Sequence, residues 1–419
     1  MAEVFVELRW RGLVAQTTDE AALRAALSAG PVTAYCGFDP TAPSLHMGNL
    51  VQLVVLRHLQ RAGHRVIALV GGSTGLIGDP RPSAERVLKS KQQTAAWVDR
   101  IREQVRPFLD FEGPNAAVLV DNLEWTEGLS ALDFLRDVGK HFRVNSMIRK
   151  EAVAARLESE EGISYTEFSY QLLQGLDFLE LHRRYGCTLQ TGGQDQWGNL
   201  TAGSDLIHRV AGVSVHLLTT PLVTDASGQK FGKSEGNAVW LGADMTSPYA
   251  FYQFWLNVED ASVVALLKVF TDRTPEEVAE LERAVAEEPF RRAAQRTLAH
   301  DVTSLVHGVA AAEAVRAASE ALFGRGDLRA LDAGTLADAT AELPGAVVAP
   351  GATLTDALVA VGLVASRNEA RRAVADGGAS LNGEREGDPD RVLVDADFLH
   401  GRVAVLRRGR RALAAARHP

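Results

Sequence analysis

The first half of the chain alternates short apolar runs with amphipathic segments, and this alternation constrains the fold more than any other feature. Residues 32–38, 66–72 and 116–122 are apolar and strand-like, whereas residues 48–61 carry apolar side chains at helical spacing. Repeated strand, helix, strand units predict a doubly wound parallel sheet of the α/β class. Ligands bind beyond the carboxyl ends of the strands in such sheets, so we expect a site there.

The pattern changes along the chain, and 419 residues are too many for one core. We expect a Rossmann-like catalytic domain over residues 1–247. The periodicity from residue 248 is helical only, which predicts an α-helical domain over 248–333. Glycine and proline are frequent in residues 334–351, which predicts a linker. Residues 352–419 are then a small α+β domain.

Shorter patterns give the expected elements of the second half. Helices are predicted in the helical domain at 263–270, 275–286 and 291–306. The last domain should contain two short helices and a strand that enters an Asn-Gly turn, at 353–361, 366–376 and 379–383.

The composition excludes several classes of protein. A formal net charge of −9 argues against general coating of nucleic acid. The two cysteines, Cys36 and Cys187, provide no disulfide framework and lack metal-ligand neighbours, which suits a reducing compartment. We found no stretch of about 18 uncharged apolar residues, and the first twelve residues carry charges throughout. We therefore expect a cytoplasmic protein without a membrane segment.

Positive charge is nevertheless concentrated near the C-terminus. The residues beyond position 400 carry six arginines and no acidic residue: Arg402, Arg407, Arg408, Arg410, Arg411 and Arg417. Such a run is often a solvated tail. The run follows a segment with an RNA-binding pattern, described below, and this position favours a contact with nucleic acid.

Two polar motifs, about 180 residues apart in the sequence, indicate a nucleotide triphosphate site. His46 and Asn49 share a face if a helix begins there, and Gly48 between them leaves room for a flat base against the backbone. Lys230 and Lys233 flank a glycine in a segment rich in turn formers, which predicts a loop able to follow phosphate charge. Alone, the first motif suits a helix start and the second a solvated turn. Together they favour catalysis.

The pair resembles the two signatures of class I aminoacyl-tRNA synthetases. Further segments make the whole chain resemble bacterial tyrosyl-tRNA synthetases; these are residues 35–41, 75–80, 168–174, 192–199 and 247–255. The resemblance implies that tyrosine is activated with ATP to tyrosyl-adenylate and then transferred to the terminal ribose of tRNA. It also implies a symmetric homodimer, with one tRNA(Tyr) spanning both subunits.

The resemblance assigns roles to individual residues. The residues implied to position and stabilise the phosphates are Thr41, His46, Asn49, Arg86, Lys230, Lys233 and Ser234. The tyrosine contacts are Tyr35, Asp79, Tyr170, Gln174, Asp177, Gln190 and Gln196, with Tyr35 and Asp177 at the phenol hydroxyl and Gln190 orienting Asp177. The ATP or adenylate contacts are Cys36, Gly37, Asp39, His46, Gly48, Asn49, Gly193, Asp195 and Lys233. Mg²⁺ is expected with the ATP phosphates, without a metal site built by the protein.

The last 70 or so residues resemble an RNA-binding domain shared with a small-subunit ribosomal protein. The RNA contacts implied are Arg367, Arg371, Arg372, Arg407 and Arg408. They would bind tRNA outside its acceptor end.

Some of these residues also have a plain structural explanation. Tyr35 and Tyr170 could be core aromatics, and Cys36 could be a buried filler. Asp177, by contrast, lies in an otherwise apolar helix, where a buried carboxylate needs a reason, and this favours a ligand-facing role. Relatives also carry a longer basic loop where this chain has only Arg81-Pro82, so the roles of Arg81 and Arg86 stay open.

Two other functions remain possible. The related tryptophan enzyme shares both signatures, but its pocket would not need Tyr35 and Asp177 together as phenol partners, and it lacks the C-terminal module. An RNA-binding protein that has lost catalysis would not need His46, Lys230 and Lys233.

Overall fold

The computed structural model describes residues 3–80, 87–160, 162–224, 233–234, 237–409 and 412–419. The chain divides into two compact units. Unit 1 comprises residues 1–245 and 259–294, and unit 2 comprises residues 246–258 and 295–419. Within the described residues, no helix has the length and apolar character needed to span a membrane.

Unit 1 is built on a six-stranded sheet in the order β1-β6-β5-β2-β3-β4. Its strands are β1 (Gln16–Thr17), β2 (Thr33–Phe38), β3 (Arg65–Val70), β4 (Val118–Asp121), β5 (Leu189–Gly193) and β6 (His216–Thr220). All neighbours are parallel except the short β1, which pairs antiparallel with β6. This strand order confirms the predicted doubly wound parallel sheet. The prediction succeeded because the central strands of such a sheet are buried on both faces and so appear in the sequence as apolar runs.

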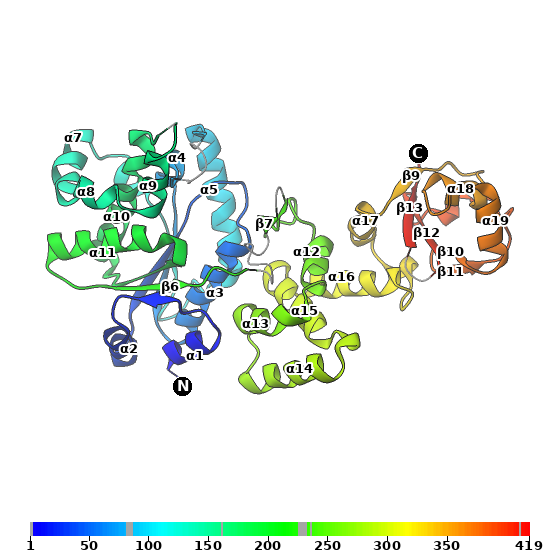
Figure 1. Ribbon diagram of the computed structural model, residues 1–419, viewed down its shortest axis with the longest axis horizontal. Coiled ribbons are helices and arrows are strands. Elements are labelled where there is room, and N and C mark those ends of the chain that lie inside the picture. Colours follow the sequence, from blue (N-terminus) through cyan, green and yellow to red (C-terminus); the bar gives the residue numbers. More distant parts are fainter. Residues whose placement is uncertain (1–2, 81–86, 161, 225–232, 235–236, 410–411) are drawn as a thin grey trace. The chain divides into compact units, whose positions relative to one another are not determined.

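Long helices cover both faces of this sheet. Helices α3 (Met47–Arg61) and α5 (Lys91–Val105) lie on one face, and α10 (Tyr165–Tyr185) and α11 (Trp197–Ala211) on the other (Figure 1). The strand order reverses direction between β2 and β5, so a crevice opens between their carboxyl ends.

Shorter elements complete unit 1. They are α1 (Val4–Trp10), α2 (Glu20–Ala29), α4 (Thr74–Ile77), α6 (Leu123–Thr126), α7 (Ala131–Asp133), α8 (Val144–Met147), α9 (Glu151–Leu157), α13 (Asp260–Phe270), α14 (Pro275–Glu287), β7 (Lys233–Ser234) and β8 (Asn237–Ala238).

A buried arginine holds α13 in unit 1. The Arg11 side chain is 4% exposed and its Nη1 donates to the carbonyl oxygen of Thr271 at 2.6 Å, just beyond the end of α13. Arg57 and Arg61 of α3 pair with Asp272 at 3.0 and 2.8 Å. The Arg11 bond satisfies a carbonyl group at the helix end, and the two ion pairs join this end to α3, beside which Phe270 lies.

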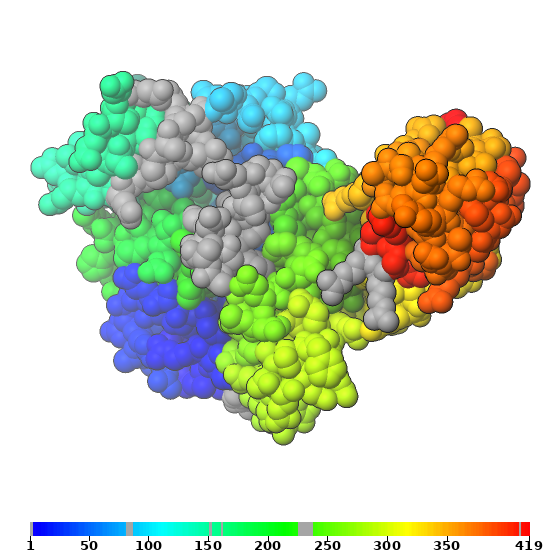
Figure 2. Space-filling view, turned by 45° about the vertical axis from the view of Figure 1, so that its right-hand side comes forward, coloured from blue at the N-terminus to red at the C-terminus, as the bar shows by residue number. Residues whose placement is uncertain are grey.

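Unit 2 joins helices to a five-stranded sheet in the order β11-β10-β12-β13-β9. Its elements are α12 (Pro248–Leu256), α15 (Ala293–His307), α16 (Val309–Leu322), α17 (Ala333–Ala341), β9 (Gly345–Val347), α18 (Leu354–Ala360), α19 (Arg367–Ala375), β10 (Ala379–Leu381), β11 (Glu384–Glu386), β12 (Val403–Arg408) and β13 (Ala412–Arg417). One buried cluster lies beneath α18 and α19. A second joins α16 and α17 to β12 and β13. Figure 2 shows the C-terminal part, in orange and red, as one compact body.

The predicted Asn-Gly turn connects β10 to β11. Leu381 pairs with Glu384, which leaves Asn382 and Gly383 as a two-residue loop. Both have positive φ, 50° and 87°, as a hairpin turn of this kind requires.

The structure departs from the expected domain plan in two places. Residues 334–351 are not a linker, because they contain most of α17 and all of β9, which pairs in parallel with β13. The expected helical domain is also divided, since α13 and α14 belong to unit 1 whereas α12, α16 and most of α15 belong to unit 2. Glycine and proline at 344–351 mark turns around β9 rather than a spacer.

Candidate active site

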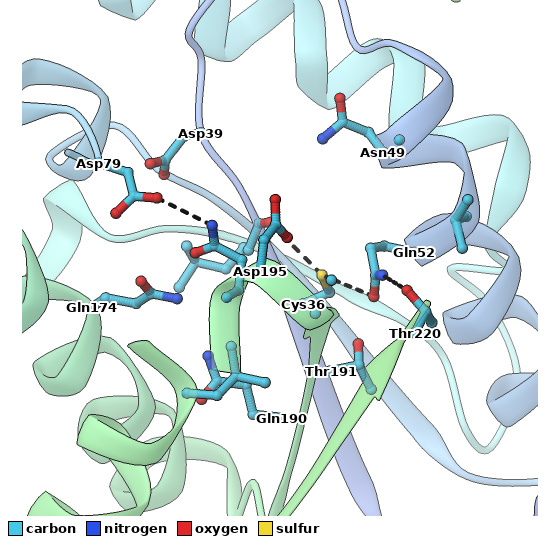
Figure 3. Close-up of a pocket in the computed structure, with 18 of the residues that line it drawn as sticks. Cys36, Asp39, Asn49, Gln52, Asp79, Gln174, Gln190, Thr191, Asp195 and Thr220 are labelled. Atoms are coloured by element: carbon cyan, nitrogen blue, oxygen red, sulfur yellow. Dashed lines mark hydrogen bonds between the residues drawn. The ribbon is translucent and has the colours of Figure 1, made fainter. Parts of the chain in front are cut away.

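A cavity of about 290 Å³ lies at the carboxyl ends of β2 and β5, where the strand order reverses. The start of α3, the loop after β3, one face of α10 and Phe270 complete its wall. Figure 3 shows polar side chains from these separate elements directed into the same space.

Most residues assigned by resemblance to tyrosine or ATP line this cavity. They are Tyr35, Cys36, Gly37, Asp39, Thr41, His46, Gly48, Asn49, Asp79, Tyr170, Gln174, Asp177, Gln190, Gly193, Asp195 and Gln196. Their placement in one cavity is established by the structure, whereas the role of each stays a prediction.

Four assigned residues cannot be placed in the same way. Arg86 and Lys230 lie outside the described residues, as does Arg81 of the short loop. Lys233 and Ser234 form β7, which pairs with β8, but only their backbone is described.

Helix α10 supplies three of the polar side chains. Tyr170, Gln174 and Asp177 are separated by four and three residues, so they share one face of the helix. The helix begins where Ser164 accepts the Glu167 amide and ends at Gly186, which has a φ of 63°. These caps fix the ends of the helix and so the face that it turns to the cavity.

Tyr35 and Asp177 form a buried polar end of the cavity. Each is 2% exposed, and the Tyr35 hydroxyl has no hydrogen-bond partner within the described structure. The Asp177 carboxylate accepts from Asn122 Nδ2 at 3.0 Å and from Trp125 Nε1 at 2.9 Å. Burial raises the pKa of the Asp177 carboxyl to about 8, although these two hydrogen bonds oppose the rise.

The expectation that Gln190 orients Asp177 is wrong. Asn122 and Trp125 hold the carboxylate, whereas the buried Oε1 of Gln190 has no hydrogen-bond partner among the described residues. Gln190 lies on β5, and the end of β4 and the helix after it supply the partners instead. The Oε1 atom of Gln174 is likewise buried without a partner in the described part of the chain. Such atoms are costly unless a ligand or water satisfies them.

Two carboxylates, Asp39 and Asp79, mark another part of the cavity. Asp39 accepts from the Tyr170 hydroxyl at 2.7 Å and from the Thr74 hydroxyl at 2.6 Å. Asp79 accepts from Gln196 Nε2 at 3.1 Å and from Asn199 Nδ2 at 3.0 Å. Neutral side chains donate these four hydrogen bonds, and the Lys150 ammonium group also interacts electrostatically with Asp79.

Helix α3 begins at Met47 with His46 as its N-cap, so the condition under which His46 and Asn49 share a face is met. His46 Nδ1 accepts from the Gly48 amide at 3.0 Å, and Asn49 Oδ1 accepts from the His46 amide at 3.0 Å. The first bond makes Nε2 the nitrogen that carries the proton in the neutral tautomer of His46, and the second makes the NH₂ group the donor end of the Asn49 amide. A Cβ on Gly48 would lie 3.0 Å from the His46 ring, which favours glycine between them.

A chain of polar contacts crosses the cavity wall near Cys36. The Cys36 thiol lies 3.8 Å from Gln52 Oε1, and Gln52 Nε2 donates to the Thr220 hydroxyl at 2.8 Å (Figure 3). Burial raises the pKa of Cys36 to about 12, so the thiol stays protonated. Cys36 is buried, as a residue that only fills the core would be, but it also lines the cavity.

Sequence reasoning missed several cavity residues and their supports. Gln52, Thr191 and Thr220 line the cavity, and Asn122 and Trp125 hold Asp177. Asn122 closes the strand predicted at 116–122, and a polar residue at a strand's carboxyl end was the available signal. Gln52 lies within a helix, where nothing in the sequence distinguished it.

The arginines assigned to RNA do not share one face of unit 2. Arg408 forms an ion pair with Glu369 of α19 at 2.7 Å. The neighbouring Arg407 instead lies against Gly324, just after the end of α16, where an added Cβ would be 2.8 Å from its Nη1. Successive strand residues point to opposite faces of a sheet, which explains the division. On α19, Arg371 pairs with Asp390 at 2.8 Å.

The remaining α19 arginines differ in their pairing. Arg367 pairs with Asp356. Arg372 is exposed and makes no ion pair with any described residue.

Within the described residues, no group of three or more histidine, cysteine, aspartate or glutamate side chains is placed to hold a metal ion.

Comparison with known protein families supports the sequence resemblance. Residues 27–324 match the family "tRNA synthetases class I (W and Y)", and residues 335–415 match the "Tyrosine--tRNA ligase SYY-like C-terminal domain". The chain is 64% identical over 412 residues to the tyrosine–tRNA ligase of Leifsonia xyli subsp. xyli, covering 98% of this chain and 93% of that one. It is 61% identical to the Streptomyces coelicolor tyrosine–tRNA ligase, covering 99% of each.

Solved structures show the same fold. A C-terminally truncated mitochondrial tyrosyl-tRNA synthetase of Coccidioides posadasii is 32% identical with a TM-score of 0.67, covering 75% of this chain and 91% of that one. A tryptophanyl-tRNA synthetase of Encephalitozoon cuniculi shares only the fold, at 13% identity and a TM-score of 0.56, covering 74% and 87%. From these matches and its near full-length identity to tyrosine–tRNA ligases, the chain belongs to the tyrosyl-tRNA synthetases, within class I of the tRNA synthetases.

Proposed function

We propose that this chain ligates tyrosine to tRNA(Tyr) in two steps, both at the cavity between β2 and β5. ATP first converts L-tyrosine to tyrosyl-adenylate and pyrophosphate, and the tyrosyl group then moves to the 3′-terminal adenosine. The observation that supports this most is that the Asp177 carboxylate and the buried Tyr35 hydroxyl, which has no hydrogen-bond partner among the described residues, lie in one cavity with the start of α3. Tyr35 and Asp177 can bind a phenol hydroxyl, and the start of α3 can bind a nucleotide.

Tyrosine is proposed to lie with its phenol hydroxyl between Tyr35 and Asp177. Burial holds the pKa of Tyr35 well above its usual range, with Asp177 adding to the rise, so this hydroxyl remains a donor. The phenol can then accept from Tyr35 and donate to Asp177. Phenylalanine would leave both groups unpaired, and tyrosyl-tRNA synthetases are themselves the established example of strong rejection by this means.

The ammonium group of tyrosine is proposed to lie near Asp79, Tyr170 and Gln174. Tyr170 donates its only hydroxyl proton to Asp39, so its oxygen is left as an acceptor. Gln174 Oε1 is a buried acceptor without a described partner. A carboxylate with two neutral acceptors matches the three N–H groups of an ammonium ion.

ATP is proposed to bind against the start of α3. His46 Nε2 and Asn49 Nδ2 can donate to the nucleotide, and Thr41 lines the same wall. The tyrosine carboxylate attacks the α-phosphate and needs no general base, so catalysis is positioning plus charge stabilisation of the leaving pyrophosphate. Lys230 and Lys233 are proposed to supply that charge. Gly193, Asp195 and Cys36 are proposed to contact the ribose, with Gln196 beside the reacting carboxylate.

Mg²⁺ is proposed to accompany ATP, held by phosphate oxygens rather than by a protein cage. When bound, it neutralises phosphate charge. The protein is proposed to work in the cytoplasm.

A homodimer is proposed through a surface patch of unit 1. Six large apolar side chains between residues 132 and 165 are exposed: Leu132, Leu135, Val144, Ile148, Leu157 and Tyr165. They come from α7, α8, α9, the start of α10 and the turns between them, and α7 to α9 group together in Figure 1. A second copy can cover such a patch by a two-fold axis.

The proposed activity is tested by tyrosine-dependent exchange of labelled pyrophosphate into ATP with Mg²⁺ present. We expect exchange with tyrosine and none above background with tryptophan or phenylalanine. Exchange with tryptophan would instead identify the related enzyme. No exchange with any amino acid would support an RNA-binding protein without catalysis.

Removing a hydroxyl partner should relax amino-acid selection. Tyr35→Phe and Asp177→Asn are each expected to reduce the tyrosine to phenylalanine ratio of kcat/KM by about tenfold or more, because each loses a buried hydrogen bond to the phenol. The KM for ATP should stay unchanged in the exchange assay. Tyr185→Phe, outside the cavity, is the matched control; equal losses for tyrosine and ATP would contradict the placement of the phenol.

The α19 face should be needed for tRNA but not for activation. Arg372→Glu is expected to raise the KM for tRNA and to lower the salt dependence of tRNA binding by about one phosphate contact. Pyrophosphate exchange should not change. Arg106→Glu in unit 1 makes the same charge change as a control, and unaltered charging by Arg372→Glu would remove α19 from the RNA surface.

The exposed patch should control the oligomeric state. The variant Leu132→Glu/Val144→Glu is expected to shift the protein from two chains to one, because four buried charges across a two-fold interface are strongly unfavourable. Light scattering after size-exclusion chromatography measures the mass. Val309→Glu is the control, since Val309 of unit 2 is 65% exposed and Val144 is 59% exposed. A variant that remains dimeric would place the interface elsewhere.

A further inference from the structure

One hydrogen-bonded chain of side chains connects the two polar ends of the cavity. Thr74, the first residue of α4, lies at its centre and is 1% exposed. Its hydroxyl donates to Asp39 Oδ1 at 2.6 Å and accepts from Asn122 Nδ2 at 3.0 Å. Asn122 Nδ2 also donates to Asp177 at 3.0 Å, and Asp39 also accepts from Tyr170 at 2.7 Å.

The direction of each hydrogen bond in this chain is fixed. The Ser73 amide donates to Asn122 Oδ1 at 2.7 Å, so the NH₂ group of Asn122 must face Thr74 and Asp177. Thr74 has a single hydroxyl proton, and the Asp39 carboxylate can only accept it. The Thr74 oxygen is then free to accept from Asn122. No member can reverse its role without breaking a neighbouring bond.

The packing around Thr74 leaves little room for rearrangement. A Cβ on Gly71 would lie 2.1 Å from Asp39 Oδ1 and 2.3 Å from the Thr74 hydroxyl oxygen. Gly71 therefore lets Asp39 and Thr74 approach closely beneath the strand end. A side chain at position 74 without a hydroxyl would place a methyl group against the Asp39 oxygen and leave one Asn122 N–H without its acceptor.

We propose that Thr74 is a positioning residue that couples recognition of the tyrosine ammonium group to recognition of its phenol hydroxyl. It acts through Asp39 and Tyr170 towards one end and through Asn122 and Asp177 towards the other. Binding at either end tightens the orientation of the same chain of hydrogen bonds. The proposal rests on the placement of tyrosine given above.

The test is equilibrium binding without ATP, which separates recognition from chemistry. Three ligands are compared: tyrosine, phenylalanine, which lacks the hydroxyl, and 3-(4-hydroxyphenyl)propionate, which lacks the ammonium group. The wild-type protein should bind both analogues more weakly than tyrosine. Two affinity ratios are compared, tyrosine to phenylalanine and tyrosine to 3-(4-hydroxyphenyl)propionate. In Thr74→Val, we expect each ratio to fall by about tenfold, because Asp39 and Asn122, which support the two ends of the site, each lose a buried hydrogen bond.

Two further variants make the outcome decisive. Thr74→Ser keeps the hydroxyl and should restore both ratios. Thr94→Val removes a hydroxyl that is also buried but has no partner in the described structure, and it should leave binding unchanged.

If Thr74→Val lowers the affinity for all three ligands equally, Thr74 has only a structural role and the proposal is overturned. A change in only one ratio would also overturn it, since the two ends would then be independent. Failure of the wild-type protein to prefer tyrosine would instead contradict the proposed function. The two failures are therefore distinguishable.

Discussion

The rest of the cavity depends on the hydrogen bonds made by the side-chain amide of Asn122. This amide is fully buried, accepts from the Ser73 backbone and donates to Thr74 and Asp177. The loop after β3, the end of β4 and helix α10 thus meet at one side chain. A buried carboxylate such as Asp177 is tolerable only with donors of this kind, so the polar end of the cavity could not form without them. Trp125 supplies the second donor one turn later.

Much of the fold could be predicted because hydrophobic periodicity encodes it locally. The helix predicted at 48–61 differs from α3 (Met47–Arg61) by one residue, and the Asn382-Gly383 turn is the one expected. The linker prediction was wrong for a physical reason. Strand β9 has three residues, and its place in the sheet is set by β13, which lies about 70 residues later in the chain. Local composition carries no record of such a distant pairing, and the same limit applies to α13, whose end is held by Arg11.

The candidate site could be predicted where motifs mark it and not where the support is scattered. Asp39, His46 and Asp177 were found through resemblance, and the structure places them in one cavity. Gln190 was given the wrong partner because it was assigned by resemblance alone, without a pattern in the sequence that places it beside Asp177. The actual partners of Asp177 are Asn122 at the end of β4 and Trp125 of the helix after it, 55 and 52 residues away in sequence. No spacing rule connects residues in three separate elements, so only the folded structure reveals these partners.

In the proposed placement of tyrosine, the polar groups left without partners at the buried end of the cavity are the source of selectivity. Burial raises the pKa of Asp177 to about 8 and leaves the Tyr35 hydroxyl without a described partner. Both features cost free energy in the empty protein, since a desolvated polar group is unfavourable until it is paired. A ligand with a hydroxyl at that depth removes the cost, whereas one without it excludes water and leaves the cost in place. If tyrosine binds as proposed, the pocket discriminates through the hydrogen bonds that the wrong ligand fails to make, and a rigid hydrogen-bonded support prevents the polar groups from relaxing around that ligand.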